Sequence, residues 1–403
     1  MTASLAHLDA AAAMRLRRAR LGVTLIFMSN GLVWANLAPR YPEIRTSIGL
    51  TYGEFGTAVM FGGLGALALG LTAAALIRRF TSARVGVTAM IAMAGAAALV
   101  PLAPNGIVFA LLLFALGAID SWVDVAQNSH GLRVQREYGR TIVNSFHAMW
   151  SVGAVLGGLM GGVAAGLKIP VAVHLAGVAV LLIAVNLYGY QLLLRGPEPE
   201  SPVTPGETKQ RAFPRVSRAV WVTLGMLSLV AIAGAWVEDS GISWSASYLF
   251  DELGAGATVA SFGFVALMAM HFVGRMVGDR LTDLYGQRTV VRVGGLITAV
   301  GMGLALAFPS IPLTIIGFGL AGLGVATTIP AAMHAADELP GFRNGTGLTI
   351  VSWALRVGFI LSPFVVGIIA DATSLRTGLG LVVVAGVVLA ILAQAMSNSR
   401  AHR

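Results

Sequence analysis

Acidic side chains inside long apolar stretches are the part of this sequence best able to do chemistry. Glu238 and Asp239 interrupt one such stretch, where an ionisable group is costly and usually functional. A carboxylic acid there can take up and release a proton, so we expect Glu238 to be the main proton carrier and Asp239 its neighbour. The alternative is that the two acids cap the outer end of a helix.

A second group of polar residues follows helical spacing in two neighbouring stretches. Asp120, Asp124 and Asn128 recur at every fourth position, which places them on one face of a helix. Asn144 and His147 share a face of the next helix in the same way. The pattern predicts a proton relay through Asp120, Asp124 and His147, with Asn128 and Asn144 available to bind a solute.

A structural interpretation of the same residues stays open. Asp124 and His147 are expected at similar depths from the ends of their helices, so they could form a hydrogen bond that only stabilises the fold. Asp124 could instead pair with Arg133 or Arg140, which follow it in the sequence.

Amides and indoles add further candidate binding residues. Asn30 and Trp34 lie four residues apart, on one face of a predicted helix. Amides bond hydroxyl groups and aromatic planes stack on sugar rings, so these residue types suit a polyol. Trp150 is a similar case, although each tryptophan could equally be a packing residue.

Arg356 lies near the middle of an apolar block, and its permanent charge requires a partner there. We expect it to bind an anionic or hydroxyl-rich substrate, or to pair with Glu238 or Asp239. His271 is expected to be a hydrogen-bonded packing residue.

Apolar blocks of about twenty residues must position these groups. Hydrophobic residues make up 56% of the 403 and charged residues only 11%, and about twenty apolar residues in a helix span a bilayer. Cys is absent, which excludes disulfides and thiolate metal sites, and we expect no metal site and no cofactor. The sequence predicts an all-α membrane protein with twelve transmembrane helices at residues 21–38, 54–77, 84–103, 106–130, 142–166, 170–193, 219–249, 257–277, 289–308, 311–332, 344–369 and 375–396.

The basic residues predict the orientation of these helices. Of the 27 Lys and Arg residues, 21 fall on one side of the twelve blocks, four on the other side and two inside blocks. The positive-inside rule assigns the rich side to the cytoplasm, so both termini are expected in the cytoplasm and the helices in the bacterial inner membrane. The net charge of +9 then reflects topology and attraction to membrane lipid, and nucleic acid is not an expected partner.

A proline-rich segment divides the chain in two. Residues 195–218 contain five prolines and mixed charge, which is typical of a flexible linker. An offset of 205 residues relates Gly117 to Gly322 and Gly153 to Gly358, as expected for parallel repeats with a substrate site between them at the midplane. We expect a tail at 1–20, six-helix bundles at 21–194 and 219–396, a linker at 195–218 and a tail at 397–403.

One loop carries a family motif. Asp279, Leu281, Asp283, Gly286 and Arg288 resemble the cytoplasmic signature loop of the major facilitator superfamily, with Asp279 in the place of its first glycine. Gly286 permits a tight turn, and Asp283 at a helix end can bind an arginine or a neighbouring helix N-terminus.

These residues, with Arg275, are expected to latch one conformation. The equivalent loop of the first half, at 77–84, keeps the arginines but has neither the acid nor the glycine. The latch is therefore expected to be one-sided.

The fourth and fifth blocks carry a narrower resemblance. The residues from Asp124 to Gly131 and from Gly139 to Gly153 are similar to a bacterial branch near the fucose-permease type of sugar–proton symporters. The glycines between Gly153 and Gly162 also resemble the antiporter signature of drug exporters, with Gly158 in the place of its proline. Close helix packing through small residues is the alternative explanation of that stripe.

The resemblance implies two six-helix bundles in the major facilitator fold, working by alternating access. We expect secondary active transport of a small polar, sugar-like solute by a monomer, coupled to protons. The alternatives are a proton-coupled exporter of drugs or amphipathic compounds, and a transporter-like sensor or scaffold. No Walker-type phosphate loop is present, so an ATP-driven pump has little support and an enzyme is not expected.

Overall fold

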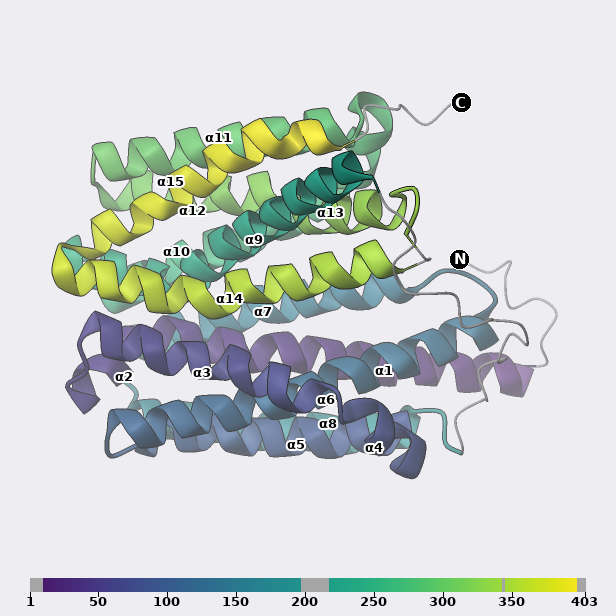
Figure 1. The fold of residues 1–403 in the computed structure, drawn as a ribbon. Helices are drawn as coiled ribbons and strands as arrows, with labels where there is room; N and C mark the ends of the chain where they lie inside the picture. Colours follow the sequence, from purple (N-terminus) through teal and green to yellow (C-terminus); the bar gives the residue numbers. More distant parts are fainter. Residues whose placement is uncertain (1–9, 197–216, 343–344, 397–403) are drawn as a thin grey trace. The chain divides into compact units, whose positions relative to one another are not determined.

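A computed structural model describes residues 10–196, 217–342 and 345–396 of the chain. Every regular element in these residues is helical, and twelve helical segments are long and apolar enough to cross a membrane (Figure 1). The expected fold class, an all-α membrane protein with twelve spans, is therefore confirmed.

Contacts divide the chain into two compact units. Unit 1 comprises Met1–Gly49 and Phe61–Pro202, and unit 2 comprises Leu50–Met60 and Val203–Arg403. The short segment Leu50–Met60 thus groups with the second unit, whereas the proline-rich linker was the only boundary expected from the sequence.

The elements that lie wholly within the described residues of unit 1 are five long helices, two short ones and two 3-10 segments. They are α1 (Ala10–Leu37), η2 (Ala38–Arg40), α2 (Tyr41–Ile48), α4 (Ala73–Phe80), α5 (Ser82–Leu99), η3 (Val100–Leu102), α6 (Gly106–Tyr138), α7 (Val143–Gly166) and α8 (Val171–Leu192). Two helices extend beyond their expected apolar blocks. The first starts at Ala10 and not at Leu21, and α6 continues to Tyr138, where Gly139 at φ 72° ends it.

Unit 2 consists of helices throughout its described residues. They are α9 (Arg218–Ser247), η4 (Tyr248–Glu252), α10 (Ala257–Tyr285), α11 (Gln287–Ala307), α12 (Ile311–Val325), α13 (Thr328–Asp337), α14 (Thr346–Ala372), α15 (Leu375–Leu392) and η5 (Ala393–Ala395). Polar caps set several starts, since Ser217 accepts a bond from the Val220 amide and Ser374 from the Thr377 amide.

Helix α3 (Tyr52–Gly70) begins in unit 2 and ends in unit 1. Asp371 at the end of α14 holds its first turn, because its two carboxylate oxygens accept the amides of Tyr52 and Gly53 at 2.8 Å each. A carboxylate is well placed at the positive end of a helix, and this bond explains why Leu50–Met60 groups with unit 2.

Glycines allow the same close helix crossing in each unit. In unit 1, α7 packs on α1 so closely that a side chain at Gly153 would collide with the Met28 carbonyl. In unit 2, α14 packs on α9, and a side chain at Gly358 would meet the Ile232 carbonyl at 2.6 Å. Gly153 and Gly358 are the pair related by the 205-residue offset, so the internal repeat expected from the sequence has matching contacts in the two units.

The glycine stripe of α7 has a packing explanation along its length. Gly157 lies against Ala35 and Leu32 of α1, and Gly161 lies against Asn36 and Pro39. Small residues permit this approach in a membrane, where van der Waals contact between helices is a main source of association.

Candidate functional site

Asn30 is the centre of a polar cluster in unit 1. Its amide Nδ2 donates to Asp120 Oδ1 at 2.6 Å, and its Oδ1 accepts from Trp150 Nε1 at 2.7 Å. Trp34 is a further hydrogen-bonding neighbour of the Asp120 carboxylate. Helices α1, α6 and α7 thus bring together Asn30, Trp34, Asp120 and Trp150, which the sequence analysis singled out separately.

The grouping adds a second interpretation of Asp120. Its role in a proton relay with Asp124 stays a prediction, and it also accepts a hydrogen bond from Asn30, which was expected to bind substrate. Asn30 is buried and its amide is bonded at both ends, which fixes the orientation of the Asp120 and Trp150 side chains around it. An oriented acid beside an indole is suited to hydroxyl groups.

The C-terminal half of α6 carries a separate group of polar residues. Asn128 Nδ2 donates to the Asp124 main-chain oxygen at 2.9 Å and to its carboxylate at 3.0 Å, and Gln127 reaches the same carboxylate at 3.5 Å. Asp124 is exposed, so its helix neighbours leave part of the carboxylate accessible.

Asn144 and His147 are exposed on α7. The His147 ring lies edge-on to Phe27, with 5.1 Å between ring centroids. The pairing of Asp124 with His147 stays a prediction, as does binding of a solute by Asn128 and Asn144.

Glu238 and His271 form a buried pair in unit 2. The Glu238 Oε1 lies 3.8 Å from His271 Nδ1, and both side chains are almost fully buried. Glu238 belongs to α9 and His271 to α10, so the pair joins two helices. His271 was expected to be a packing residue, and its position beside the candidate proton carrier was missed.

The Asp239 carboxylate lies beside serines, whereas Glu238 lies beside His271. Ser362 and Ser243 are hydrogen-bonding neighbours of its carboxylate. Its Oδ2 is buried without a hydrogen-bond partner among the residues that the structure describes. Ser240 and Ser362 bond to each other at 2.9 Å, so α9 and α14 share a polar contact at this level. The two adjacent acids therefore have different environments.

Arg356 does not have the acidic partner considered for it. The residue is exposed on α14, and it makes no hydrogen bond or ion pair within the described part of the chain. Pairing with Glu238 or Asp239 is therefore wrong for this structure, because Glu238 is beside His271 and Asp239 beside serines. Binding of a substrate by Arg356 stays a prediction.

Arg288 of the signature loop bonds main-chain carbonyls at the end of the last helical segment. Its Nε donates to the Met396 carbonyl at 3.0 Å and its Nη2 to the Gln394 carbonyl at 3.1 Å. Gly286 adopts φ 80° and makes the turn between α10 and α11. Arg288 therefore fastens α11 to the end of the last helix.

The other residues proposed for the latch remain accessible. Arg275, Asp279 and Asp283 are exposed, and Asp283 makes no hydrogen bond or ion pair within the described residues. A latch through these residues stays a prediction.

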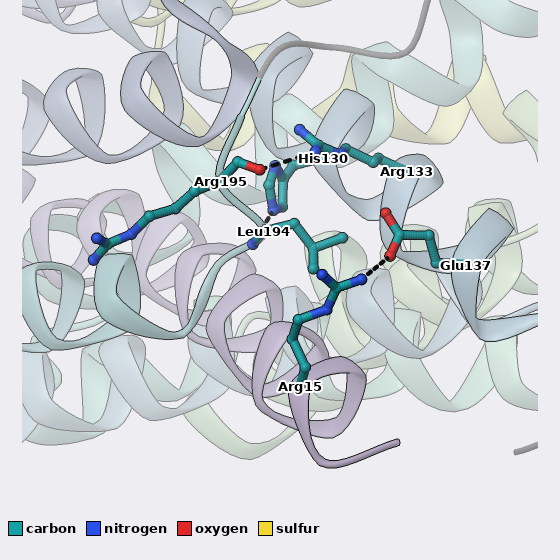
Figure 2. A network of polar contacts seen from close by, with 6 residues as sticks. All are labelled: Arg15, His130, Arg133, Glu137, Leu194 and Arg195. Carbon is teal, nitrogen blue, oxygen red and sulfur yellow. Dashed lines mark hydrogen bonds and ion pairs between the residues drawn. The ribbon is translucent and has the colours of Figure 1, made fainter. Parts of the chain in front are cut away.

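A polar network that the sequence analysis missed lies at the end of unit 1 where α8 leads into the linker (Figure 2). His130 Nε2 accepts from the Leu194 amide at 3.3 Å, which leaves its Nδ1 proton to donate to Ser82 Oγ at 2.8 Å. Arg133 donates to the carbonyls of Arg195 and Gly196 at 3.2 Å each. A single buried histidine has no distinctive sequence pattern, so only the structure reveals this anchor.

Replacing His130 by Leu is expected to lower the free energy of unfolding by about 1–3 kcal/mol, because a buried donor and a buried acceptor lose their partner. The thermal unfolding midpoint of the purified protein measures the effect. His334→Leu is the control, since His334 is largely exposed beside Glu338. Equal shifts for the two variants would contradict the assignment of His130 as an anchor.

Comparison with known proteins agrees with this architecture. The sequence matches the family Major Facilitator Superfamily over residues 23–270 and 228–400. It is 30% identical over 377 residues to "Uncharacterized transporter y4wD" of Sinorhizobium fredii, covering 94% of this chain and 98% of that protein. It is also 30% identical over 389 residues to an uncharacterized MFS-type transporter of Yersinia pestis, covering 93% and 94%.

Solved structures share the fold at low sequence identity. A bacterial homologue of the human lysosomal transporter Spinster, inward-facing and occupied, superposes with a TM-score of 0.74 at 18% identity, covering 93% of this chain and 94% of the other. A D-xylose–proton symporter gives 0.69 at 13% identity with 93% and 97% covered. The transporter FucP, in the outward conformation, gives 0.59 at 18% identity with 94% and 99% covered.

The chain therefore belongs to the Major Facilitator Superfamily. It is a multi-pass membrane transporter of that family and not an enzyme, as the twelve apolar helices and the signature loop predicted.

Proposed function

We propose that this protein moves a small polar, sugar-like solute across the bacterial inner membrane by alternating access, as a proton-coupled symporter. The observation that carries the proposal is the cluster in which Asn30 holds Asp120 at 2.6 Å and Trp150 at 2.7 Å. A carboxylate and amide bond hydroxyl groups, while the indole planes of Trp34 and Trp150 stack on a sugar ring. The cluster supports a hydroxyl-rich ligand better than an amphipathic one.

Three further residues are proposed to bind the solute. Arg356 is proposed on its own account as a binding group, because it offers a positive charge and up to five N–H donors. Asn128 and Asn144 supply amides on α6 and α7. Each is exposed or half-buried in the structure and thus accessible to a solute.

Glu238 is the proposed proton carrier. A buried carboxylate next to a histidine can exchange a proton with that ring, and gain or loss of the proton changes the interaction between α9 and α10. Asp239, Asp124, His147 and Asp120 are the alternative carriers. Arg275, Asp279, Asp283, Gly286 and Arg288 are proposed to bias the conformational equilibrium at the signature loop.

The proposal also covers the orientation of the helices in the membrane, the bundle boundaries and the oligomeric state. The excess of Lys and Arg on one side of the spans supports cytoplasmic termini. We assign the six-helix bundles to residues 21–194 and 219–396 with the linker at 195–218, and propose that the transporter works as a monomer. Drug export is not favoured, because the glycine stripe of α7 is explained by contact with α1.

A thermal-shift screen tests the proposed ligand class. Sugars such as D-xylose and L-fucose, organic acids and amphipathic drugs are added separately to the purified protein, and a sugar is expected to raise the unfolding midpoint. Asn30→Ala is expected to weaken binding of that sugar by at least about tenfold, because the Asp120 and Trp150 side chains lose their common partner; one good charged hydrogen bond contributes about 1.5–3 kcal/mol.

Asn186→Ala is the matched control for this variant. Asn186 is also a buried amide of unit 1, but its amide nitrogen bonds Ser29 and its own helix and does not bond Asp120 or Trp150. Stabilisation by amphipathic compounds alone, or equal loss of sugar binding in both variants, would contradict the proposed ligand class.

A further inference from the structure

A groove on unit 1 lies apart from the polar cluster. It has a volume of about 680 Å³ and is bounded by α4, α5, α6 and α8. Its wall is mainly apolar, formed by Leu76, Val87, Ile91, Trp122 and Leu187 among others, and none of its lining residues is acidic. Leu187 and Ala92 are exposed, so the groove is open at the surface.

Positive charge gathers at one end of this groove. Arg84 lines it in the first turn of α5 and is exposed, and its guanidinium makes no hydrogen bond or ion pair within the described residues. Tyr190 also lines it, and the Arg195 guanidinium lies 5.4 Å from the centre of the Tyr190 ring. Phe80, at the same end, has the Arg79 guanidinium 5.3 Å from its ring.

The backbone adds to the positive potential at that end. Helix α5 begins at Ser82, so its unpaired amides and the positive end of its dipole lie beside Arg84. Two other lining side chains have polar atoms, and both are engaged within the protein: the Thr88 hydroxyl donates to the Arg84 carbonyl at 2.8 Å, and the Trp122 indole N–H donates to the Thr72 hydroxyl at 2.8 Å. An occupant must therefore be anionic at this end and apolar along the rest.

We propose that this groove binds an anionic phospholipid, with one acyl chain along the apolar wall and the phosphate at Arg84, supported by Arg79 and Arg195. The orientation proposed from the arginine distribution places this end at the cytoplasmic leaflet, where anionic headgroups attract basic side chains. A free phosphate would leave the apolar wall uncovered, and a neutral lipid would leave Arg84 without a partner. The chemistry of both ends fits one lipid molecule.

Native mass spectrometry of the purified full chain tests the proposal. The protein is incubated with equal amounts of phosphatidylglycerol and phosphatidylcholine, and the retained lipids are counted. Wild type is expected to retain phosphatidylglycerol preferentially. Arg84→Gln is expected to reduce that preference about fivefold, the contribution of one basic residue near an anionic lipid surface.

Two further variants test the acyl-chain contacts and the specificity of the Arg84 effect separately. Ala92→Trp fills the groove without changing charge and is expected to reduce retained phosphatidylglycerol. Arg136→Gln removes an exposed arginine of unit 1 that does not line the groove and is expected to leave retention unchanged. Equal retention of the two lipids by wild type, equal effects of Arg84→Gln and Arg136→Gln, or no effect of Ala92→Trp would each overturn the proposal. The readout does not require transport, so it is independent of the proposed symport.

Discussion

Replacing Glu238 by Gln is expected to abolish proton-driven accumulation of the solute while leaving solute exchange intact. Glutamine has the shape of the protonated acid but cannot release a proton, so the variant should behave as a permanently protonated carrier. Its neighbour His271, 3.8 Å away across α9 and α10, would no longer face a group that changes charge. Binding should be retained, because Glu238 is outside the Asn30 cluster.

Proteoliposomes with an imposed pH difference measure this effect. One pH unit supports about tenfold accumulation for one coupled proton, since one unit corresponds to about 1.4 kcal/mol. Wild type should approach that ratio and Glu238→Gln should reach no accumulation, whereas counterflow exchange should be similar in both. Glu338→Gln is the matched control, because Glu338 is exposed at the end of α13. Accumulation that survives in Glu238→Gln would assign the proton to another acid, Asp239 or Asp124.

The second large effect is expected at the crossing of α1 and α7. Gly153→Leu should destabilise the protein by about 3 kcal/mol or more, because even a first side-chain carbon at this position collides with the Met28 carbonyl and overpacking costs about 1–3 kcal/mol in milder cases. Gly358→Leu should have a similar effect through the Ile232 carbonyl in unit 2.

Gly95→Leu provides the control for both substitutions. Gly95 is also in a membrane-spanning helix of unit 1, but no heavy atom lies within 4 Å of a carbon added there. Thermal unfolding midpoints and the yield of monodisperse protein would show the difference. If Gly153→Leu and Gly95→Leu unfold at the same temperature, the glycine stripe does not serve packing, and the resemblance to an exporter signature regains support.

The fold could be predicted from the sequence because the length and hydropathy of a segment indicate whether it can cross a membrane. These two properties predicted twelve spans, and the 205-residue repeat predicted the equivalent glycines Gly153 and Gly358, whose contacts agree. Helix ends were less predictable, since α1 begins in a basic segment that hydropathy excludes.

The site was only partly predictable because its contacts join distant residues. Asn30 and Asp120 are 90 positions apart, and Asn30 and Trp150 are 120 apart, so spacing could nominate each residue but not group them. Hydrogen-bonded pairs within one helix could be predicted from sequence spacing, as Asp124 and Asn128 show. The partners of His271, His130 and Arg288 depend on which helices pack together. A local sequence pattern does not predict that packing.

Recording the pH inside proteoliposomes while solute enters tests proton-coupled transport most directly. A pH-sensitive dye is enclosed, and the sugar ranked first by thermal shift is added outside with no imposed pH difference. We predict that wild type acidifies the lumen as the sugar enters and that Glu238→Gln does not. Entry of labelled sugar through wild type without any change of lumenal pH would contradict proton-coupled symport.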